Sequence, residues 1–132
     1  MYRSACITAV LLLAAPRAIA AEPLRATVAC VPVAEPGRVR CDVDAKLAEG
    51  TIRWADVEIL SVPDLAAPLK GRIGPHEATL KEPNAWRFAL ALVAKRAGSG
   101  PVVLRVRAVA CDANDTCTPF VVEARGEVKV GP

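Results

Sequence analysis

The sequence predicts an all-β fold, an antiparallel β-sandwich, from three observations. Short runs of residues alternate between apolar and polar side chains, and a period of two is what a half-buried strand produces. Turn-forming residues separate these runs about every ten residues, which is typical of sandwich folds. The segment from residue 21 onward carries four cysteines, an even number that indicates disulfide bonds in a small exported domain. About seven strands in roughly 110 residues indicate an immunoglobulin-like sandwich.

Residues 1–20 have the three parts of a secretory signal peptide. Arg3 supplies the positive charge, residues 7–15 form the apolar centre, and Ala18-Ile19-Ala20 is a small-x-small cleavage site. The apolar run is shorter than the roughly 20 residues that a membrane-spanning helix needs. We therefore expect cleavage after Ala20, a single mature domain over residues 21–132, and a periplasmic or secreted protein. The abundance of Ala, Arg and Val indicates a bacterial source with GC-rich DNA.

Cleavage removes Arg3 and Arg17, so the 17 basic residues of the whole chain fall to 15 against 14 acidic ones, a net charge of +1. The remaining residues contain no Lys/Arg cluster with interleaved aromatics, the pattern of a nucleic-acid-binding surface. They also contain no second apolar run of membrane-spanning length. We expect a monomer whose partners are proteins, with no nucleic acid, no bound cofactor and no stable membrane insertion.

About seven strands follow from the alternation. It is clearest in Arg38–Leu47, where Val39 and Cys41 point to one face and Arg40 and Asp42 point to the other. The predicted strands cover residues 24–31, 38–47, 51–60, 69–73, 86–92, 102–111 and 117–130. The fourth, Leu69–Ile73, is a short edge strand in a Pro/Gly-rich segment, where a partner's strand could add to the sheet. Loops are expected at residues 95–101 and 112–116.

The alternation is less regular in two stretches, residues 51–60 and 85–95. In Thr51–Leu60 the apolar residues change faces midway, which predicts a β-bulge near Ala55-Asp56. Residues 85–95 are the best helical candidate, but the period of two in their large side chains favours a strand. Both tryptophans, Trp54 and Trp86, are expected to anchor the core.

The four mature cysteines allow three pairings. One pairing is suggested by antibody domains, in which a buried disulfide joins the two sheets and the order along the chain is Cys…Trp…Cys. The same order occurs here in Cys41, Trp54 and Cys111. Cys41 lies on the apolar face of its strand, whereas Cys111 shares a face with Arg105 and Arg107. A buried bond between sheets needs both cysteines inward, so this pairing is disfavoured.

Two hairpin disulfides fit the faces better. Cys30 and Cys41 lie inward on strands joined by a turn, and Cys111 and Cys117 lie on the polar face at the end of one hairpin. A register slip of one residue would reverse these faces. We expect Cys30–Cys41 to be structural and worth about 2–4 kcal/mol. The Cys111–Cys117 bond is expected at an exposed loop, accessible to an attacking thiolate.

Other candidate sites are disfavoured. His76 is the only histidine, and no motif fixes a serine or cysteine partner near it, so it is expected to be a solvated loop residue. The cysteine spacings lack the Cys-x2-Cys of zinc sites, so no metal is expected. Asp112, Asn114 and Asp115 contain part of a calcium-loop pattern but lack its glycine and distal glutamate.

The second hairpin resembles a known family. The stretch Ala110-Cys111-Asp-Ala-Asn-Asp-Thr-Cys117-Thr-Pro119, which closes an immunoglobulin-like sandwich, resembles the N-terminal periplasmic domain of DsbD-type thiol–disulfide interchange proteins. The resemblance implies that Cys111 and Cys117 are a redox-active pair and that Cys117 is the contact for a partner. It also implies that the pair receives electrons from a membrane-embedded protein and passes them to periplasmic thiol proteins.

Two functions from different classes follow. The first is a non-enzymatic structural or protein-binding module of the bacterial cell envelope. The second is a thiol–disulfide exchange domain, which would make the protein an oxidoreductase. The charges on the hairpin favour neither, because Arg105 and Arg107 would stabilise a thiolate whereas Asp112 and Asp115 would destabilise it.

Overall fold

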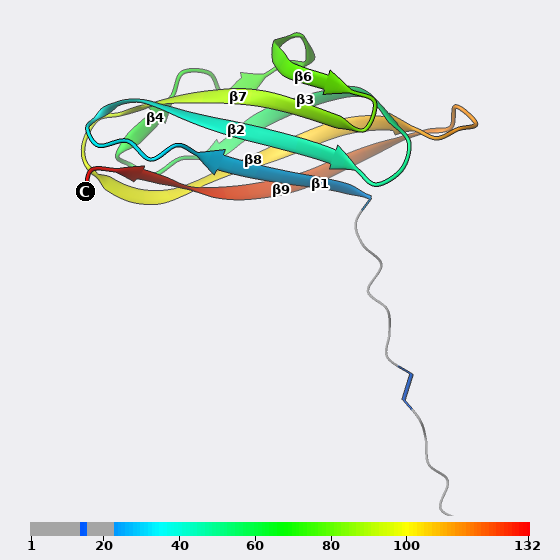
Figure 1. Ribbon diagram of the computed structural model, residues 1–132, viewed down its shortest axis with the longest axis horizontal. Coiled ribbons are helices and arrows are strands. Elements are labelled where there is room, and N and C mark those ends of the chain that lie inside the picture. The colour runs from blue at the N-terminus through cyan, green and yellow to red at the C-terminus, as the bar shows by residue number, and fades with distance from the viewer. Residues whose placement is uncertain (1–13, 16–22) are drawn as a thin grey trace, which may run out of the picture.

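The computed structural model describes residues 14–15 and 23–132. The predicted signal peptide, residues 1–20, therefore lies outside the described residues except at Ala14 and Ala15. Residues 23–132 form two antiparallel sheets packed face to face (Figure 1). The strands are β1 Leu24–Cys30, β2 Gly37–Leu47, β3 Thr51–Ser61, β4 Ala66–Pro68, β5 Arg72–Ile73, β6 Ala78–Glu82, β7 Ala85–Ala94, β8 Gly98–Cys111 and β9 Cys117–Val130, with a 3-10 helix, η1, at Pro75–Glu77. Within the described ranges, no helix is long and apolar enough to cross a membrane.

The strand order is that of an immunoglobulin-like sandwich. The first sheet runs β1-β2-β7-β4, with β6 paired to another stretch of β7, and the second runs β5-β3-β8-β9. β1, β2 and β7 correspond to strands A, B and E of immunoglobulin folds, β6 takes the place of strand D, and the second sheet corresponds to C′-C-F-G. The predicted all-β fold class is confirmed, and both hairpin disulfides, Cys30–Cys41 and Cys111–Cys117, are present.

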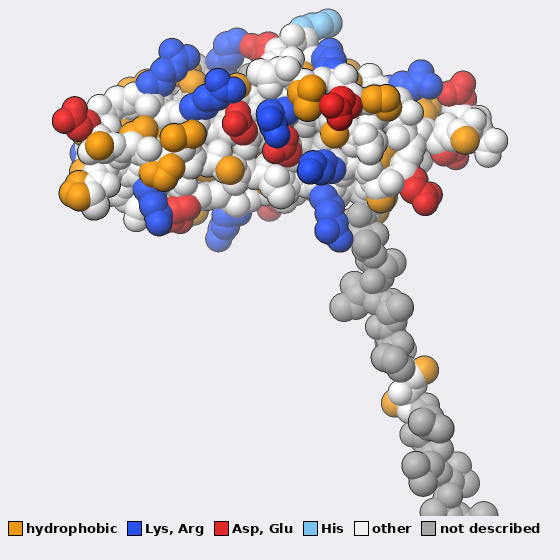
Figure 2. Space-filling view, viewed as in Figure 1, with side chains coloured by type: hydrophobic (Ala, Val, Ile, Leu, Met, Phe, Trp, Pro, Cys, Tyr) orange, Lys and Arg blue, Asp and Glu red, His pale blue; other side chains and the backbone are white. Residues whose placement is uncertain are grey.

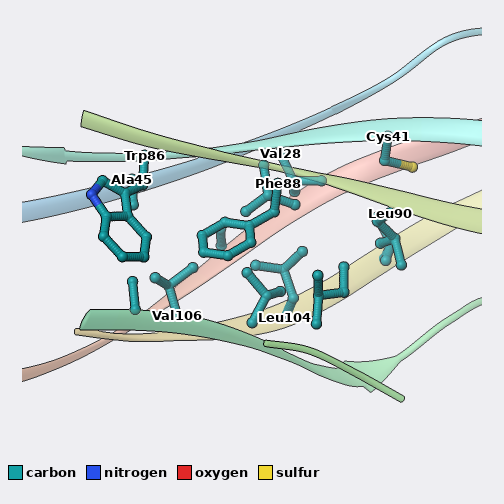
Figure 3. Close-up of a cluster of buried hydrophobic side chains, with 14 of the residues drawn as sticks. Val28, Cys41, Ala45, Trp86, Phe88, Leu90, Leu104 and Val106 are labelled. Atoms are coloured by element: carbon teal, nitrogen blue, oxygen red, sulfur yellow. The ribbon is translucent and has the colours of Figure 1, made fainter. Parts of the chain in front are cut away.

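The core lies between the two sheets. Every second residue is buried along most of β2, β7 and β8, so these strands supply much of the interior. Phe88 and Leu90 of β7 face Leu104 and Val106 of β8 across the space between the sheets (Figure 3). Trp86 is buried as predicted, and its ring centroid lies 6.3 Å from that of Phe88.

β1 and β9 bring the two sheets together at one edge. Val33, just after β1, forms a parallel bridge with β9: its N–H donates to the Lys129 carbonyl at 3.1 Å, and its carbonyl accepts from the Gly131 N–H at 2.8 Å. Farther along β9, a Cβ at Gly126 would come within 2.9 Å of both the carbonyl oxygen and the side chain of Val28. The close approach of β1 and β9 therefore requires glycine at position 126.

Residues 23–132 contain nine strands rather than about seven. The alternation does not predict β4 and β6, because each pairs with only a few residues of β7 and β6 contains no fully buried residue. The predicted edge strand 69–73 is reduced to Arg72–Ile73, which pairs with β3. β8 begins at Gly98, so the second half of the predicted 95–101 loop is strand. Residues 85–94 form β7, as the period of two predicts.

The register of β3 with β8 shifts twice, once before the predicted position at Ala55-Asp56 and once after it, between Ile59 and Ser61. The first shift is between Ile52 and Trp54, so Arg53 is the extra residue. Ala55 then faces the core, and Trp54 lies on the outer face, where the guanidinium carbon of Arg107 is 5.5 Å from the Trp54 ring centroid. The prediction that Trp54 anchors the core is wrong, because a one-residue shift turns each side chain to the opposite face.

Replacing Gly126 by alanine should destabilise the domain by about 1–3 kcal/mol, because the added methyl group would overlap Val28 and separate β1 from β9. Urea unfolding of the oxidised protein measures the loss. Gly71→Ala is the matched control, since nothing lies within 4 Å of a Cβ at Gly71. That variant should keep its stability or gain up to about 1 kcal/mol. Equal losses in the two variants would contradict a close β1–β9 contact at Gly126.

Candidate functional site

The β8–β9 hairpin extends past the neighbouring strands at one end of the molecule, opposite the C-terminus (Figure 1). Its strands pair continuously from Gly98–Val130 to Cys111–Cys117, and the disulfide joins this last pair. The N–H of Asp112 donates to the Thr116 carbonyl at 3.0 Å, so the adjacent cysteines form a non-hydrogen-bonded pair. The disulfide therefore fixes the base of the loop that follows.

Asp112 organises this loop. Its Oδ1 accepts the backbone N–H of Asn114 at 2.8 Å and that of Thr116 at 3.0 Å. Asp115 has a left-handed φ of 58°, a conformation that aspartate tolerates better than most residues. The Asp115 carboxylate pairs with the Arg53 guanidinium of β3 at 3.0 Å. The loop is thus exposed but held in one conformation by its own hydrogen bonds.

The two cysteines of the hairpin disulfide differ in exposure. Cys117 is exposed, whereas Cys111 is only 5% exposed. Both lie on the outer face of the sheet, as predicted, but β3 begins opposite Cys111 at Thr51. The β2–β3 turn is so close that a Cβ at Gly50 would come within 2.7 Å of the Cys111 carbonyl oxygen. The expected exposed disulfide is therefore open to solvent only on the Cys117 side.

The arginines expected to stabilise a thiolate are engaged elsewhere. Arg107 donates two hydrogen bonds to the Asp56 carboxylate, and these raise the pKa of the Arg107 guanidinium. Arg105 lies 3.6 Å from a carboxylate oxygen of Glu58 and 3.9 Å from one of Glu123. Along β8, Arg107 is about 13 Å from Cys111, a distance at which an exposed charge is largely screened. The charges on this face therefore give little support to a thiolate at Cys111.

The other disulfide, Cys30–Cys41, joins β1 to β2 against the core. Cys41 is fully buried and Cys30 is half-buried, so both face inward as predicted. The N–H of Val31 donates to the Arg40 carbonyl at 2.9 Å, which makes this cysteine pair non-hydrogen-bonded too. Burial of Cys41 shields this bond from an attacking thiolate.

An apolar patch lies on the outer face of the second sheet beside the hairpin disulfide. The strand register aligns Trp54, Val109 and Pro119 across β3, β8 and β9, and Val121 follows Pro119 on the same face. Trp54 and Val109 are half-buried, Pro119 is exposed, and Val121 is 60% exposed. We call these four residues the Trp54 face. A contiguous group of apolar side chains on an outer face, two of them exposed, is a candidate interaction surface.

A network of charges borders the Trp54 face. Asp56 is 2% exposed although it lies on the outer side of the sheet, because it pairs with Arg107 and, at 3.7 Å, with Arg72. Arg72 also lies 3.9 Å from Glu58, which connects this group to Arg105. Each carboxylate therefore has an arginine partner, and Arg107 is fixed in place over the Trp54 ring.

The Trp54 face was not predicted from the sequence, because the alternation within β3 places Trp54 in the core. One signal was available in β9. The alternation assigns Phe120 and Val122 to the inner side of that strand, which leaves Val121 as an apolar residue among the polar ones. An exposed Val121 beside Pro119 was therefore deducible, but its alignment with Trp54 depended on the bulge at Arg53.

The sheet edges near this patch do not favour strand addition. Val109 and Pro119 lie two residues from the disulfide-bonded pair, so they are also a non-hydrogen-bonded pair. The backbone nitrogen of Pro119 therefore points away from β8, to the open edge of β9. Proline has no N–H to offer an added strand at that position. The predicted edge strand at Leu69–Ile73 offers only the two-residue β5.

The remaining sequence candidates do not assemble into a site. His76 is exposed in η1, as expected for a loop residue. In the part of the chain that the structure describes, no three His, Cys, Asp or Glu side chains are grouped as metal ligands. The site that the structure brings together is the Trp54 face with the adjacent Cys111–Cys117 hairpin.

Asp56→Asn should lower the free energy of unfolding by about 2 kcal/mol, because a buried amide cannot replace charge-assisted hydrogen bonds to the arginines. Thermal unfolding near neutral pH measures the change. Asp42→Asn is the matched control, since Asp42 and Arg40 form an ion pair with exposed side chains at 3.3 Å, and its loss should stay below about 1 kcal/mol. Similar losses in both variants would show that the Asp56 network does not stabilise the outer face.

No protein-family model matches the chain, and no curated protein matches it in sequence. Similar solved structures include a PapD-like domain of human CEP192, with 5% identity and a TM-score of 0.44 over 95% of this chain and 100% of that one. The bacterial hydrophobin BslA has 8% identity and a TM-score of 0.43 over 84% and 97%. A chain of a type I cohesin–dockerin complex from Clostridium thermocellum has 12% identity and a TM-score of 0.47 over 87% and 99%. These similarities are too distant to indicate a function, and the fold assignment depends on the strand order and the core.

Proposed function

We propose that the protein is an exported, non-enzymatic protein-binding module of the cell envelope that contacts its partner through the Trp54 face. One observation carries this proposal: half-buried Trp54 packs against Arg107 on the same face as exposed Pro119 and Val121. Tryptophan and arginine are the residues that most often dominate the binding energy of protein interfaces.

The charged residues around the Trp54 face support this proposal. The cations that form ion pairs there are all arginines, namely Arg53, Arg72, Arg105 and Arg107. Protein interfaces are enriched in arginine and depleted in lysine, because the guanidinium is planar and more weakly hydrated than an ammonium. Each of these arginines already has a carboxylate partner, so a partner surface that covers them need not supply opposite charges.

The rigidity of the hairpin also favours binding. The disulfide fixes the base of the β8–β9 loop, and Asp112 holds its backbone. A surface that is ordered before it meets a partner loses little conformational entropy on association. The hairpin disulfide then has a structural role, which is to hold Pro119 and Val121 in register with Trp54.

The two disulfides support the export part of the proposal. Such bonds form and persist in oxidising compartments such as the bacterial periplasm or the extracellular space. The predicted signal peptide, residues 1–20, would deliver the chain to that compartment.

A photo-crosslinking amino acid placed at position 121 in cells that export the protein should form an adduct with a partner protein. The same amino acid at position 93 is the control, because Val93 is 37% exposed on the outer face of the other sheet. Trp54→Ala should weaken the purified complex about tenfold or more, because a half-buried tryptophan contributes strongly to an interface. Isothermal titration calorimetry measures this loss.

Two outcomes would contradict this docking surface. Equal adduct yields at positions 121 and 93 would mean that the contact is not specific to the Trp54 face. A complex whose affinity is the same with Trp54→Ala and with the control Arg40→Ala would remove Trp54 from the interface.

Thiol–disulfide exchange is the second candidate, favoured by the exposure of Cys117 and by the resemblance of the hairpin to DsbD-type N-terminal domains. In this exchange, a partner thiolate attacks Sγ of Cys117 and forms a mixed disulfide. The Cys111–Cys117 bond breaks, and Cys111 leaves as a thiolate. Arg105 and Arg107 are engaged with carboxylates and do not stabilise that leaving thiolate, so this candidate ranks second.

A glutathione redox series, with thiol alkylation and peptide mass mapping, distinguishes the two functions. For a binding module, both disulfides should stay closed down to roughly −300 mV, the range of structural disulfides. Opening of Cys111–Cys117 near about −200 mV, with Cys30–Cys41 still closed, would contradict a purely structural role for the hairpin bond and favour exchange.

A further inference from the structure

A hollow lies on the first sheet, where two short strands leave part of β7 uncovered. β4 pairs with β7 at residues 92–94, and β6 pairs with it at residues 85–88. Between these pairings, the 69–77 segment and β7 enclose a hollow of about 260 Å³. Figure 2 shows the face over β2 and β7, where hydrophobic side chains lie between those of Lys and Arg.

Five of the eight residues that line this hollow are apolar, and the other three are charged. Ala89 and Ala91 point outward from β7, and their small side chains leave space above the sheet. Leu90 and Ile73 are the buried members of the lining, and Leu69 is 54% exposed. An exposed leucine beside a hollow is apolar surface that a ligand would remove from water.

The rim formed by the 69–77 segment is fixed. Leu69 donates its N–H to the Ala91 carbonyl at 3.0 Å. Lys70 forms an ion pair with Glu77, whose carboxylate also accepts the Gly74 N–H at 2.9 Å. The hydrogen bonds from Lys70 and Gly74 lower the pKa of Glu77, so the Glu77 carboxylate stays ionised at neutral pH. Sites for small molecules are usually largely formed before the ligand arrives.

The charge of the hollow is set by Arg38. This residue of β2 lines the hollow and belongs to none of the ion pairs among the described residues, whereas nearby Arg40 pairs with Asp42 at 3.3 Å. The charges of Lys70 and Glu77 cancel. The lining therefore carries one uncompensated positive charge, which a single anionic group would complement.

We propose that this hollow binds a small monocarboxylate with an unbranched apolar chain. The carboxylate would accept hydrogen bonds from the Arg38 guanidinium, which can donate two in parallel. The chain would lie against Ala89, Ala91 and Leu69. A volume of about 260 Å³ equals that of roughly nine water molecules in the liquid. A chain of about eight carbons fits in this space. The hollow is on the sheet opposite the Trp54 face, so this inference is independent of the proposed function.

Octanoate titrated into the ¹⁵N-labelled protein tests this site. It should shift the amide signals of Leu69, Ala89 and Ala91, with a Kd of about 1 mM or tighter. Octylammonium has the same chain and the opposite charge, and it should bind at least about tenfold more weakly. Acetate, which lacks the chain, should cause no shifts at these amides. No shifts at about 10 mM octanoate, or shifts confined to other surfaces, would overturn the proposal.

Two variants separate the charge from the apolar lining. Arg38→Gln should weaken octanoate binding about tenfold and leave 1-octanol binding unchanged. Arg25→Gln is the matched control, because Arg25 of β1 is also exposed and belongs to none of the ion pairs among the described residues, and it should not change octanoate binding. Ala91→Leu should abolish binding of both probes by filling the hollow, with retained dispersion of the amide signals as evidence that it folds. Equal weakening by Arg38→Gln and Arg25→Gln would mean that octanoate responds to net charge, and the proposed site would be wrong.

Discussion

The alternation of buried and exposed residues in β2, β7 and β8 is the constraint on which the rest of the structure depends. The inward side chains of these strands pack together between the sheets. A period of two then directs every other residue outward. Arg105 and Arg107 lie outward on β8 for this reason, and both reach carboxylates on β3. Burial of apolar side chains thus decides where the charged network lies.

Both disulfides follow from the same constraint. In an antibody domain the disulfide passes through the core between the sheets, but here Cys111 lies outward and Cys41 inward, so each bonds with its hairpin neighbour. The bonded cysteines are 11 and 6 residues apart, and short loops restrict the unfolded chain less than long ones. The apolar core must therefore hold the two sheets together. The Cys111–Cys117 disulfide stabilises only the β8–β9 hairpin.

Strands that bury alternate residues were predictable from the sequence. Arg38–Leu47 and residues 102–111 and 117–130 are strands with the expected faces, and those faces correctly predicted both disulfides. β4 and β6 were not predictable, because edge strands with few buried residues have little alternation. Trp54 was misplaced for a different reason. Pairing with β8 determines which residue of β3 is the extra one in the bulge. The sequence of β3 alone does not reveal this pairing.

The outward position of Trp54 links the two candidate functions. Cys117 and Pro119 lie two residues apart on one face, so a partner docked on the Trp54 face would bring its own residues close to Cys117. A partner that docks on that face nevertheless needs no sulfur chemistry. Exchange also requires a leaving thiolate at Cys111 to be stabilised. Arg107 is instead paired with Asp56 and held over Trp54. The ion pair that builds the docking surface thus lies too far from Cys111 to stabilise a leaving thiolate there.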